Sequence, residues 1–237
     1  LNSITISFRI SLFCSNFVVS KQSMSMIKGV ITGDLVNSTN IAAEWRQAVV
    51  GALYKCAADF SPLTPINIEM YRGDSFQVVV GNPEYALTVA VAFRAKLRAS
   101  TPEKKEMWDA RVSVGIGDVS FESDNIVTSD GEAFRLSGRT LDTMGKKRLT
   151  ISTPWCDFNK SIELVTRFAD EVVSSWTAKQ ANVVYHSLMS PKTQKDMAVE
   201  LGLSKQNFNS HWTSAKVQLI LDYLEYYKTL IVKYNQL

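Results

Sequence analysis

The segment VITGDLVNST, residues 30–39, is a run rich in β-branched residues that ends in one aspartate and a small polar turn. It overlaps residues 27–34, which we predict to be a buried strand. A carboxylate at the end of a buried strand needs a partner, because an isolated charge is costly away from water. Asp34 therefore either binds a cation or caps the helix that follows.

Strand-like and helix-like segments alternate after this first strand. Apolar residues at helical spacing predict a helix over residues 40–60, and two β-rich runs around a Gly-Asp turn predict a hairpin over 66–80. The order β-α-β-β-α-β is that of a ferredoxin-like, or palm-type, sheet. We therefore predict an α+β domain over residues 26–175. Its later elements are a helix (84–100), a strand (110–121), a helix (130–144) and a strand (148–152).

Composition limits the function classes without choosing one. The 237 residues are 46% hydrophobic and 21% charged, which suits one large or two modest globular domains, and the net charge of +3 permits a nucleic-acid or polyphosphate partner. The cysteines Cys14, Cys56 and Cys156 are far apart and only two histidines accompany them, so we expect neither a disulfide scaffold nor a zinc site. A reducing cytoplasm is the expected location.

The first 25 residues are expected to be a loose leader or a translated upstream segment. Their apolar run is broken by Ser11, Ser15 and Asn16, which is poor for a signal peptide, the weaker alternative. No later segment approaches 18 uninterrupted apolar residues, so we expect no membrane span.

Asp34 and Asp74 form the first candidate site. In a βαββ unit the first strand lies beside the hairpin, so the two carboxylates can approach each other. Close carboxylates repel unless a divalent cation lies between them, and hard oxygen ligands suit Mg²⁺ (or Mn²⁺) bound with nucleotide phosphates. The alternative is that Asp34 caps a helix and Asp74 makes a turn.

Four segments, in order, resemble the class III nucleotidyl cyclases. VITGDLVNST is similar to their first metal-binding segment, YRGDSFQVVV to their Gly-Asp hairpin, RVSVGIGDV to their Arg-x-Gly-Ile strand, and GEAFRLSGRTL to the helix of their transition-state residues. The resemblance implies Asp34 and Asp74 as metal ligands, with the Leu35 carbonyl, and Arg139 as the arginine that stabilises phosphate charge. It also implies a homodimer that shares its sites. The nucleotide contacts that we predict are Asn37, Ser38, Thr39, Gly73 and Thr128.

Two positions depart from the cyclase pattern. Met70 stands where an adenylate cyclase has its base-reading lysine, and Arg135 stands where the family has asparagine. Usual adenine recognition is therefore not expected, although Arg135 and Arg139 at i, i+4 would suit a polyphosphate. The alternative is that both arginines are solvated or bonded to Asp142 or Glu132.

Residues 193–215 match a helix-turn-helix pattern. An apolar inner face leads to Gly202 at the turn, Ser204 caps the second helix, and Phe208 and Trp212 pack it back. The second helix exposes side chains that can donate to phosphates and base edges. The alternative is a motif used only for protein contacts. The DNA contacts that we predict are Lys205, Gln206, Asn207, Asn209, Ser210 and His211.

Residues 176–237 are predicted to form a small all-α domain around this motif. A helix over 178–189 precedes the motif, and an amphipathic helix ends the chain with an apolar stripe that must be buried against the trihelical unit or a second subunit. The stripe consists of Val217, Ile220, Leu221, Leu224, Tyr227 and Ile231.

This arrangement of a cyclase-like domain and a helix-turn-helix resembles the SatD family of small bacterial proteins. The resulting hypothesis is a cytoplasmic regulator whose N-terminal domain binds a magnesium–nucleotide or related phosphate ligand and whose C-terminal domain binds DNA as a homodimer. An active nucleotidyl cyclase (a phosphorus-oxygen lyase) with altered base specificity is the alternative. A degenerate cyclase fold used only for dimerisation is the third possibility.

Overall fold

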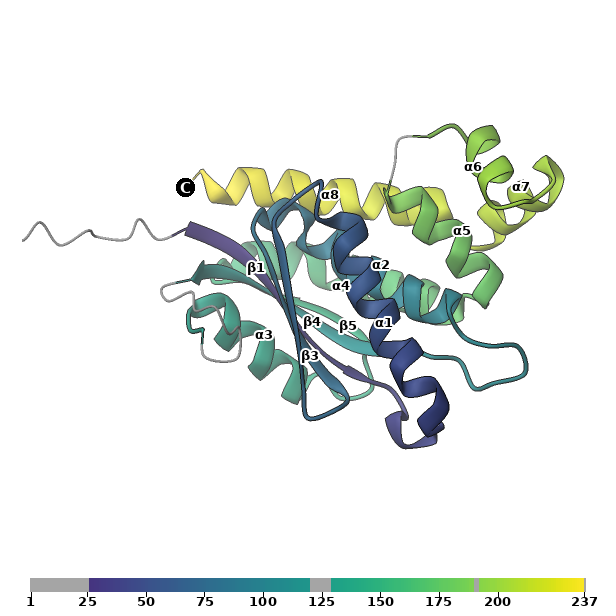
Figure 1. Ribbon diagram of the computed structural model, residues 1–237. Helices are drawn as coiled ribbons and strands as arrows, with labels where there is room; N and C mark the ends of the chain where they lie inside the picture. The colour runs from purple at the N-terminus through teal and green to yellow at the C-terminus, as the bar shows by residue number, and fades with distance from the viewer. Residues whose placement is uncertain (1–25, 120–128, 190–191, 237) are drawn as a thin grey trace, which may run out of the picture.

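The predicted β-α-β-β-α-β order is present in the computed structural model, which describes residues 26–119, 129–189 and 192–236. One mixed five-stranded sheet forms the centre of the fold (Figure 1). Its strands follow the spatial order β2-β3-β1-β4-β5. The strands are β1 (Met26–Leu35), β2 (Ile66–Tyr71), β3 (Ser75–Val80), β4 (Ala110–Val119) and β5 (Leu149–Ser152).

The first four strands have the ferredoxin-like arrangement. β1 lies between β3 and β4 and is antiparallel to both, while β2 is antiparallel to β3. β5 extends this sheet by pairing parallel to β4. The predicted hairpin is confirmed as β2–β3, and its turn uses the left-handed region at Arg72 (φ 57°) and Gly73 (φ 80°), a conformation that glycine adopts without strain.

The two faces of the sheet are covered by different helices. α1 (Ala43–Phe60) and α2 (Ala86–Ala99) cover one face, where Ile31 packs, and α3 (Glu132–Thr143) covers the other (Figure 1). On the α3 face, Thr32 and Ser137 share a hydrogen bond of 2.8 Å. Since side chains alternate along a strand, β1 contributes to both layers. Two short 3₁₀ helices complete this part, η1 (Ser38–Asn40) and η2 (Pro83–Tyr85).

Helix α3 lies directly on β4. A Cβ atom added at Gly115 would stand 2.2 Å from the carbonyl oxygen of Ala133 and 2.7 Å from the backbone nitrogen of Ser137. Both are backbone atoms that no side-chain rotation can move aside. Gly115 is therefore required for the close approach of helix and strand.

The part after residue 175 is helical, as predicted, and one further helix, which we did not predict, ends the part before it. This helix, α4 (Cys156–Ser175), follows β5 and packs against it. The predicted apolar stripe of the last helix is buried except for the half-buried Leu221, and its contacts are with α4, η2 and α2 as well as with α5 and α7. The other helices are α5 (Ala178–Met189), α6 (Gln194–Glu200), α7 (Lys205–Ser214) and α8 (Val217–Asn235).

A buried ionic network joins α2, β4 and α4. The carboxylate of Asp109 accepts two hydrogen bonds of 2.9 Å from Arg94 and one of 2.8 Å from Arg98, and both Asp109 and Arg94 side chains are fully buried. Arg94 also donates to Asp170, and Arg98 donates to the backbone oxygen of Trp176 at 3.0 Å. One hydrophobic core runs through both parts of the chain, and the boundary near residue 175 stays a prediction.

No helix within the described ranges combines the length and the apolarity needed to cross a bilayer.

Candidate functional site

The turn between β1 and α1 is held by backbone hydrogen bonds from both sides. The amide of Leu35 donates to the carbonyl of Asp74 in the hairpin, and the amide of Val36 donates to the carbonyl of Asp109 before β4, each at 2.9 Å. Asn37 then takes a left-handed conformation (φ 52°) and starts η1. The turn is thereby fixed between the β2–β3 hairpin and the start of β4.

A cavity of about 220 Å³ opens between this turn, the first part of α1 and the hairpin. Five residues predicted from the sequence line it: Leu35, Ser38, Thr39, Gly73 and Asp74. The hydroxyl of Ser38 donates to the carboxylate of Asp74 at 2.9 Å and so ties the turn to the hairpin.

Two charged residues that line the cavity were missed by sequence reasoning. Arg46 comes from the first turns of α1 and Arg72 from the hairpin, so two basic residues and one acidic residue line the cavity. Their proximity depends on the packing of α1 beside the hairpin. Arg72 directly precedes Gly73 and Asp74 in the sequence, and this position is a signal from which Arg72 could have been predicted. Arg46 has no such signal. Guanidinium and hydroxyl groups together are the donors that bind phosphate oxygens.

Asp34 lies opposite Arg111 in the β1–β4 register and does not line the cavity. The Arg111 guanidinium donates to both carboxylate oxygens, with a distance of 2.9 Å from Nε to Oδ1. Thr32 faces α3, and Asp34, two residues later, is expected on the same face by strand alternation. The hydrogen bonds to Asp34 raise the pKa of Arg111. The partner of the Asp34 carboxylate is therefore the Arg111 guanidinium. That partner is neither a metal ion nor the N-terminus of a helix.

The two aspartates do not fit a shared cation in this arrangement. Both oxygens of Asp34 accept from Arg111, whereas Asp74 accepts from Ser38. No group of three or more His, Cys, Asp or Glu side chains suited to a metal ion occurs among the residues that the structure describes. The Mg²⁺ or Mn²⁺ site stays a prediction that requires Arg111 to move.

The two arginines of α3 stay outside this cavity. Arg135 is exposed and forms an ion pair of 3.0 Å with Asp130. The partners expected from the sequence were Asp142 and Glu132. Arg139 is exposed, and no hydrogen bond or ion pair of its side chain occurs in the described part of the chain. Within one chain, α3 lies on the sheet face opposite α1, so the predicted catalytic pair does not meet the cavity residues. Thr128 lies outside the described residues.

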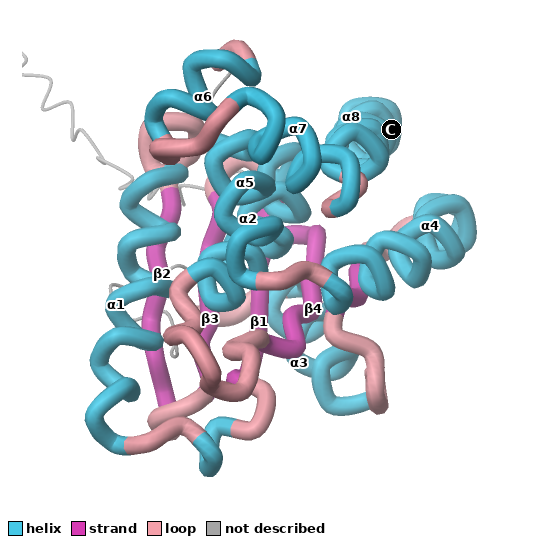
Figure 2. The backbone as a smooth tube through the Cα atoms, turned by 90° about the vertical axis from the view of Figure 1, so that its right-hand side faces the viewer, coloured by secondary structure: helices cyan, strands magenta, loops and turns pink. Residues whose placement is uncertain are grey.

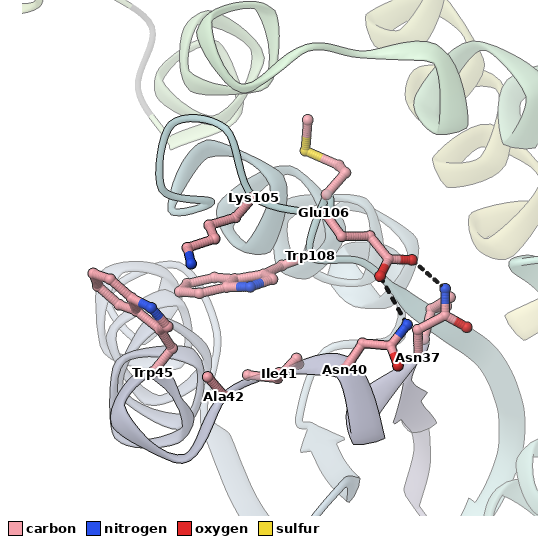
Figure 3. Close-up of a pocket in the computed structure, with 10 residues that line it drawn as sticks. Asn37, Asn40, Ile41, Ala42, Trp45, Lys105, Glu106 and Trp108 are labelled. Carbon is pink, nitrogen blue, oxygen red and sulfur yellow. Dashed lines mark hydrogen bonds between the residues drawn. The ribbon is translucent and has the colours of Figure 1, made fainter.

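A second, smaller pocket of about 70 Å³ adjoins the same turn (Figure 3). Asn37 and Asn40 both donate to the carboxylate of Glu106, which lowers the pKa of that carboxyl. The rings of Trp45 and Trp108 lie 6.2 Å apart beside it. Asn37 is thus directed to Glu106, and it does not line the larger cavity with Ser38 and Thr39.

The predicted DNA-contact residues lie on α7. Thr193 caps α6 and Ser204 caps α7, each with a side-chain oxygen that accepts a backbone N–H, and Gly202 takes the left-handed conformation (φ 64°) between them. Phe208 is buried and its ring lies 5.8 Å from that of Trp212. His211 is half-buried. The other five predicted contacts are exposed: Lys205, Gln206, Asn207, Asn209 and Ser210.

No protein-family model and no curated protein matches the sequence. Among solved structures, two structures of a bacterial light-regulated adenylyl cyclase are 10% and 12% identical to the chain, with TM-scores of 0.38 and 0.37. Each alignment covers 54% of this chain and 43% of the cyclase chain, so the chain spans less than half of their length. The active GGEEF domain of a diguanylate cyclase from Vibrio cholerae is 15% identical, with a TM-score of 0.34, over 53% of this chain and 83% of that domain. At these TM-scores the matches assign no activity.

Proposed function

We propose that the chain is a bacterial cytoplasmic regulator that binds a nucleotide or related phosphate ligand in the cavity beside α1 and binds DNA through α7. The observation that supports ligand binding is that Arg46, Arg72, Ser38 and Thr39 line one cavity. A polyphosphate would accept hydrogen bonds from all four side chains, and its charge would be neutralised by the two guanidinium groups. The SatD-like architecture is part of this proposal.

Asp74 is the cavity's own carboxylate and would repel a bare phosphate. A divalent cation bound with the phosphates would relieve this repulsion, because Mg²⁺ commonly uses one or two carboxylates together with phosphate oxygens. The residues available to hold it are Asp74 and, after release from Arg111, Asp34. The ion would neutralise phosphate charge, and the arginines would orient the ligand.

The DNA-binding half of the proposal depends on α7. Its exposed polar face carries Lys205 and four neutral residues with hydrogen-bonding side chains, and its inner face is fixed by Phe208. A short, capped helix of this kind, supported by a second helix, suits insertion into the major groove. A homodimer would present two such helices to one site.

Isothermal titration calorimetry with ATP, GTP and pyrophosphate, each with Mg²⁺, tests ligand binding. We expect at least one of them to bind, and we expect the Arg46→Gln/Arg72→Gln double variant to lose at least tenfold in affinity, about 1.4 kcal/mol. Lys146→Gln, which removes an exposed positive charge elsewhere, is the matched control. Silence toward all three probes, or equal binding by the double variant, would contradict the proposed site.

The second candidate function is a nucleotidyl cyclase with altered base specificity, and it is favoured by the placement of Asp34, Asp74 and Arg139 on elements that occur in the cyclase order. Incubation with each nucleoside triphosphate and Mg²⁺ or Mn²⁺ tests it. A cyclic product that disappears in Asp34→Ala would establish the enzyme. A dimer that neither binds nor converts any nucleotide would favour the third possibility, a degenerate fold used for dimerisation.

A further inference from the structure

The exposed large hydrophobic side chains of the chain are concentrated on two helices. In the described ranges nine such side chains are exposed, and six of them belong to α4 or α8. A contiguous exposed apolar patch marks an interaction surface, whereas scattered exposed apolar residues need no explanation. Five of these six residues lie along or beside one groove, and we call them the α4–α8 face: Leu164, Val165, Phe168, Leu219 and Tyr226.

A groove of about 500 Å³ runs between these two helices, and its lining is almost entirely apolar. The helices are antiparallel, since Phe158 near the start of α4 packs on Tyr227 in the second half of α8, while Trp176 after α4 donates to the backbone oxygen of Ala215 before α8. Thr166 and Tyr223 share a buried hydrogen bond of 2.8 Å at the centre. The groove therefore has a fixed floor. Figure 2 shows both helices on the side of the molecule away from α1 and β2.

We propose that a second copy of this chain docks on the α4–α8 face. The face carries both parts of a self-complementary contact: Phe168, which is 64% exposed, projects from it, and the groove lies beside that side chain. A two-fold axis places the projecting ring of each copy against the groove of the other, and such an isologous contact closes on itself. This inference does not depend on the proposed function.

The charges along α4 support the same occupant. In an antiparallel pair of α4 helices whose two-fold axis passes between Val165 and Thr166, residues whose numbers sum to 331 lie level with each other, so Phe168 lies within one residue of the partner's Leu164. The same register places Lys160 opposite the partner's Glu171 and Arg167 within one residue of the partner's Glu163. Within the described part of the chain, no ion pair engages Arg167, Glu163 or Glu171, and Lys160 has only a loose contact of 3.6 Å with the exposed Asp157. Opposite charges thus line up across the axis, and like charges do not.

A small apolar molecule would not use all these features. It could occupy the groove, but it would leave Leu164 exposed and would make no use of the charges along α4. A second copy covers the apolar residues and pairs the charges together. The test below separates the two occupants.

Sedimentation equilibrium and light scattering on the full chain measure the association directly. We expect the wild type to be a dimer and Phe168→Glu to raise the dissociation constant at least about 30-fold, as truncation of a central interface residue does. Tyr54→Glu is the matched control, because Tyr54 is an exposed aromatic residue on α1, and this variant should remain dimeric. Circular dichroism should show that Phe168→Glu keeps the wild-type helix content.

A charge exchange tests the register without removing apolar area. Arg167→Glu should weaken the dimer about tenfold, and the Arg167→Glu/Glu163→Arg double variant should recover most of the loss, since exposed pairs in a good geometry couple by about 1 kcal/mol each and occur twice. The proposal is overturned if the wild type is still monomeric at a protein concentration of about 100 µM. A dimer that Phe168→Glu leaves intact, or a monomer whose groove binds a fluorescent apolar probe, overturns it as well.

Discussion

Arg111 donates hydrogen bonds to both carboxylate oxygens of Asp34, from the strand position directly opposite in the β1–β4 register. The pair is only partly exposed, with 35% of the Arg111 side chain and 23% of the Asp34 side chain accessible. The guanidinium compensates the negative charge of the carboxylate and occupies one lone pair on each oxygen, so a divalent cation beside the pair is disfavoured. Asp34 can therefore serve as a metal ligand only when Arg111 is displaced.

Replacement of Arg111 should accordingly strengthen metal binding. In Arg111→Gln we expect the affinity for Mn²⁺ to rise about tenfold, or ~1.4 kcal/mol, because the carboxylate of Asp34 is released while Asp74 is unchanged. Electron paramagnetic resonance titration of free Mn²⁺ measures this. The gain should vanish when Asp34→Asn is added to Arg111→Gln. Equal Mn²⁺ affinity of the wild type and Arg111→Gln would show that Asp34 is no part of a metal site.

The buried aspartate Asp109 is expected to be essential for stability. Arg94, Arg98 and Arg148 all donate to its carboxylate. Its removal leaves cations without their partner, which typically costs about 3–5 kcal/mol for a buried pair. Urea unfolding of Asp109→Asn should show a loss of that order. Asp157→Asn, at an exposed position, should stay within about 0.5 kcal/mol of the wild type, and a similarly small effect at Asp109 would contradict the role of the network.

The same carboxylate should make stability depend on pH. Burial alone would raise the pKa of Asp109, but the ion pairs with Arg94 and Arg98 outweigh it and hold the pKa below its usual value. A lowered folded-state pKa gives stability that is present above the unfolded-state value, about 3.9, and is lost as pH falls through the folded-state value. We expect the difference in unfolding free energy between wild type and Asp109→Asn to be constant from pH 7 to about pH 5 and to shrink below pH 4. A difference that grows on acidification would contradict this assignment.

Local patterns in the sequence predicted most elements of the sheet domain, because these elements have one apolar face and clear turn residues. The β2–β3 hairpin follows from its Gly-Asp turn, and β1 from its apolar run. Helix α4 was not predicted, although its apolar residues recur at helical spacing, with Ile162 and Ala169 on its buried side and Leu164 and Phe168 on its exposed side.

The site could be predicted only in part, for a related reason. Ser38, Thr39 and Asp74 were found because they stand in short polar turns that follow strands. Arg111 is 77 residues from Asp34, and the two meet only when β4 pairs with β1 in one register. A shift of one residue would place Arg111 on the other face of the sheet. Pairings of this kind belong to tertiary structure and leave no local signal.

Two glycines that look alike in the sequence should respond oppositely to alanine. At Gly115 the added Cβ meets backbone atoms of α3 at 2.2 and 2.7 Å, so Gly115→Ala should lower the unfolding free energy by about 1–3 kcal/mol or more. At Gly138, within α3, an added Cβ has no neighbour within 4 Å, and alanine should stabilise the helix by up to about 1 kcal/mol. Thermal unfolding of both variants measures the contrast. If Gly115→Ala is as stable as the wild type, α3 does not lie this close to β4.

The assignment of α7 as the DNA-reading helix makes a prediction about salt dependence. Lys205 is exposed at the first position of α7, where it can reach a phosphate, so Lys205→Ala should weaken binding to all sequences and lower the salt slope by about one. Asn209, one turn later, is placed to read a base edge, so Asn209→Ala should cost about 1–3 kcal/mol on a selected site. It should leave the salt slope unchanged.

These two effects can be separated from general loss of charge. Fluorescence anisotropy over a series of salt concentrations, on a duplex selected from a random library and on a scrambled duplex, gives both the slope and the specificity ratio. Lys179→Ala removes an exposed positive charge from α5 and should change neither quantity. If Lys205→Ala and Asn209→Ala both bind as the wild type does, α7 does not contact DNA. If only Asn209→Ala binds as the wild type does, α7 contacts the phosphate backbone without reading the sequence at that position.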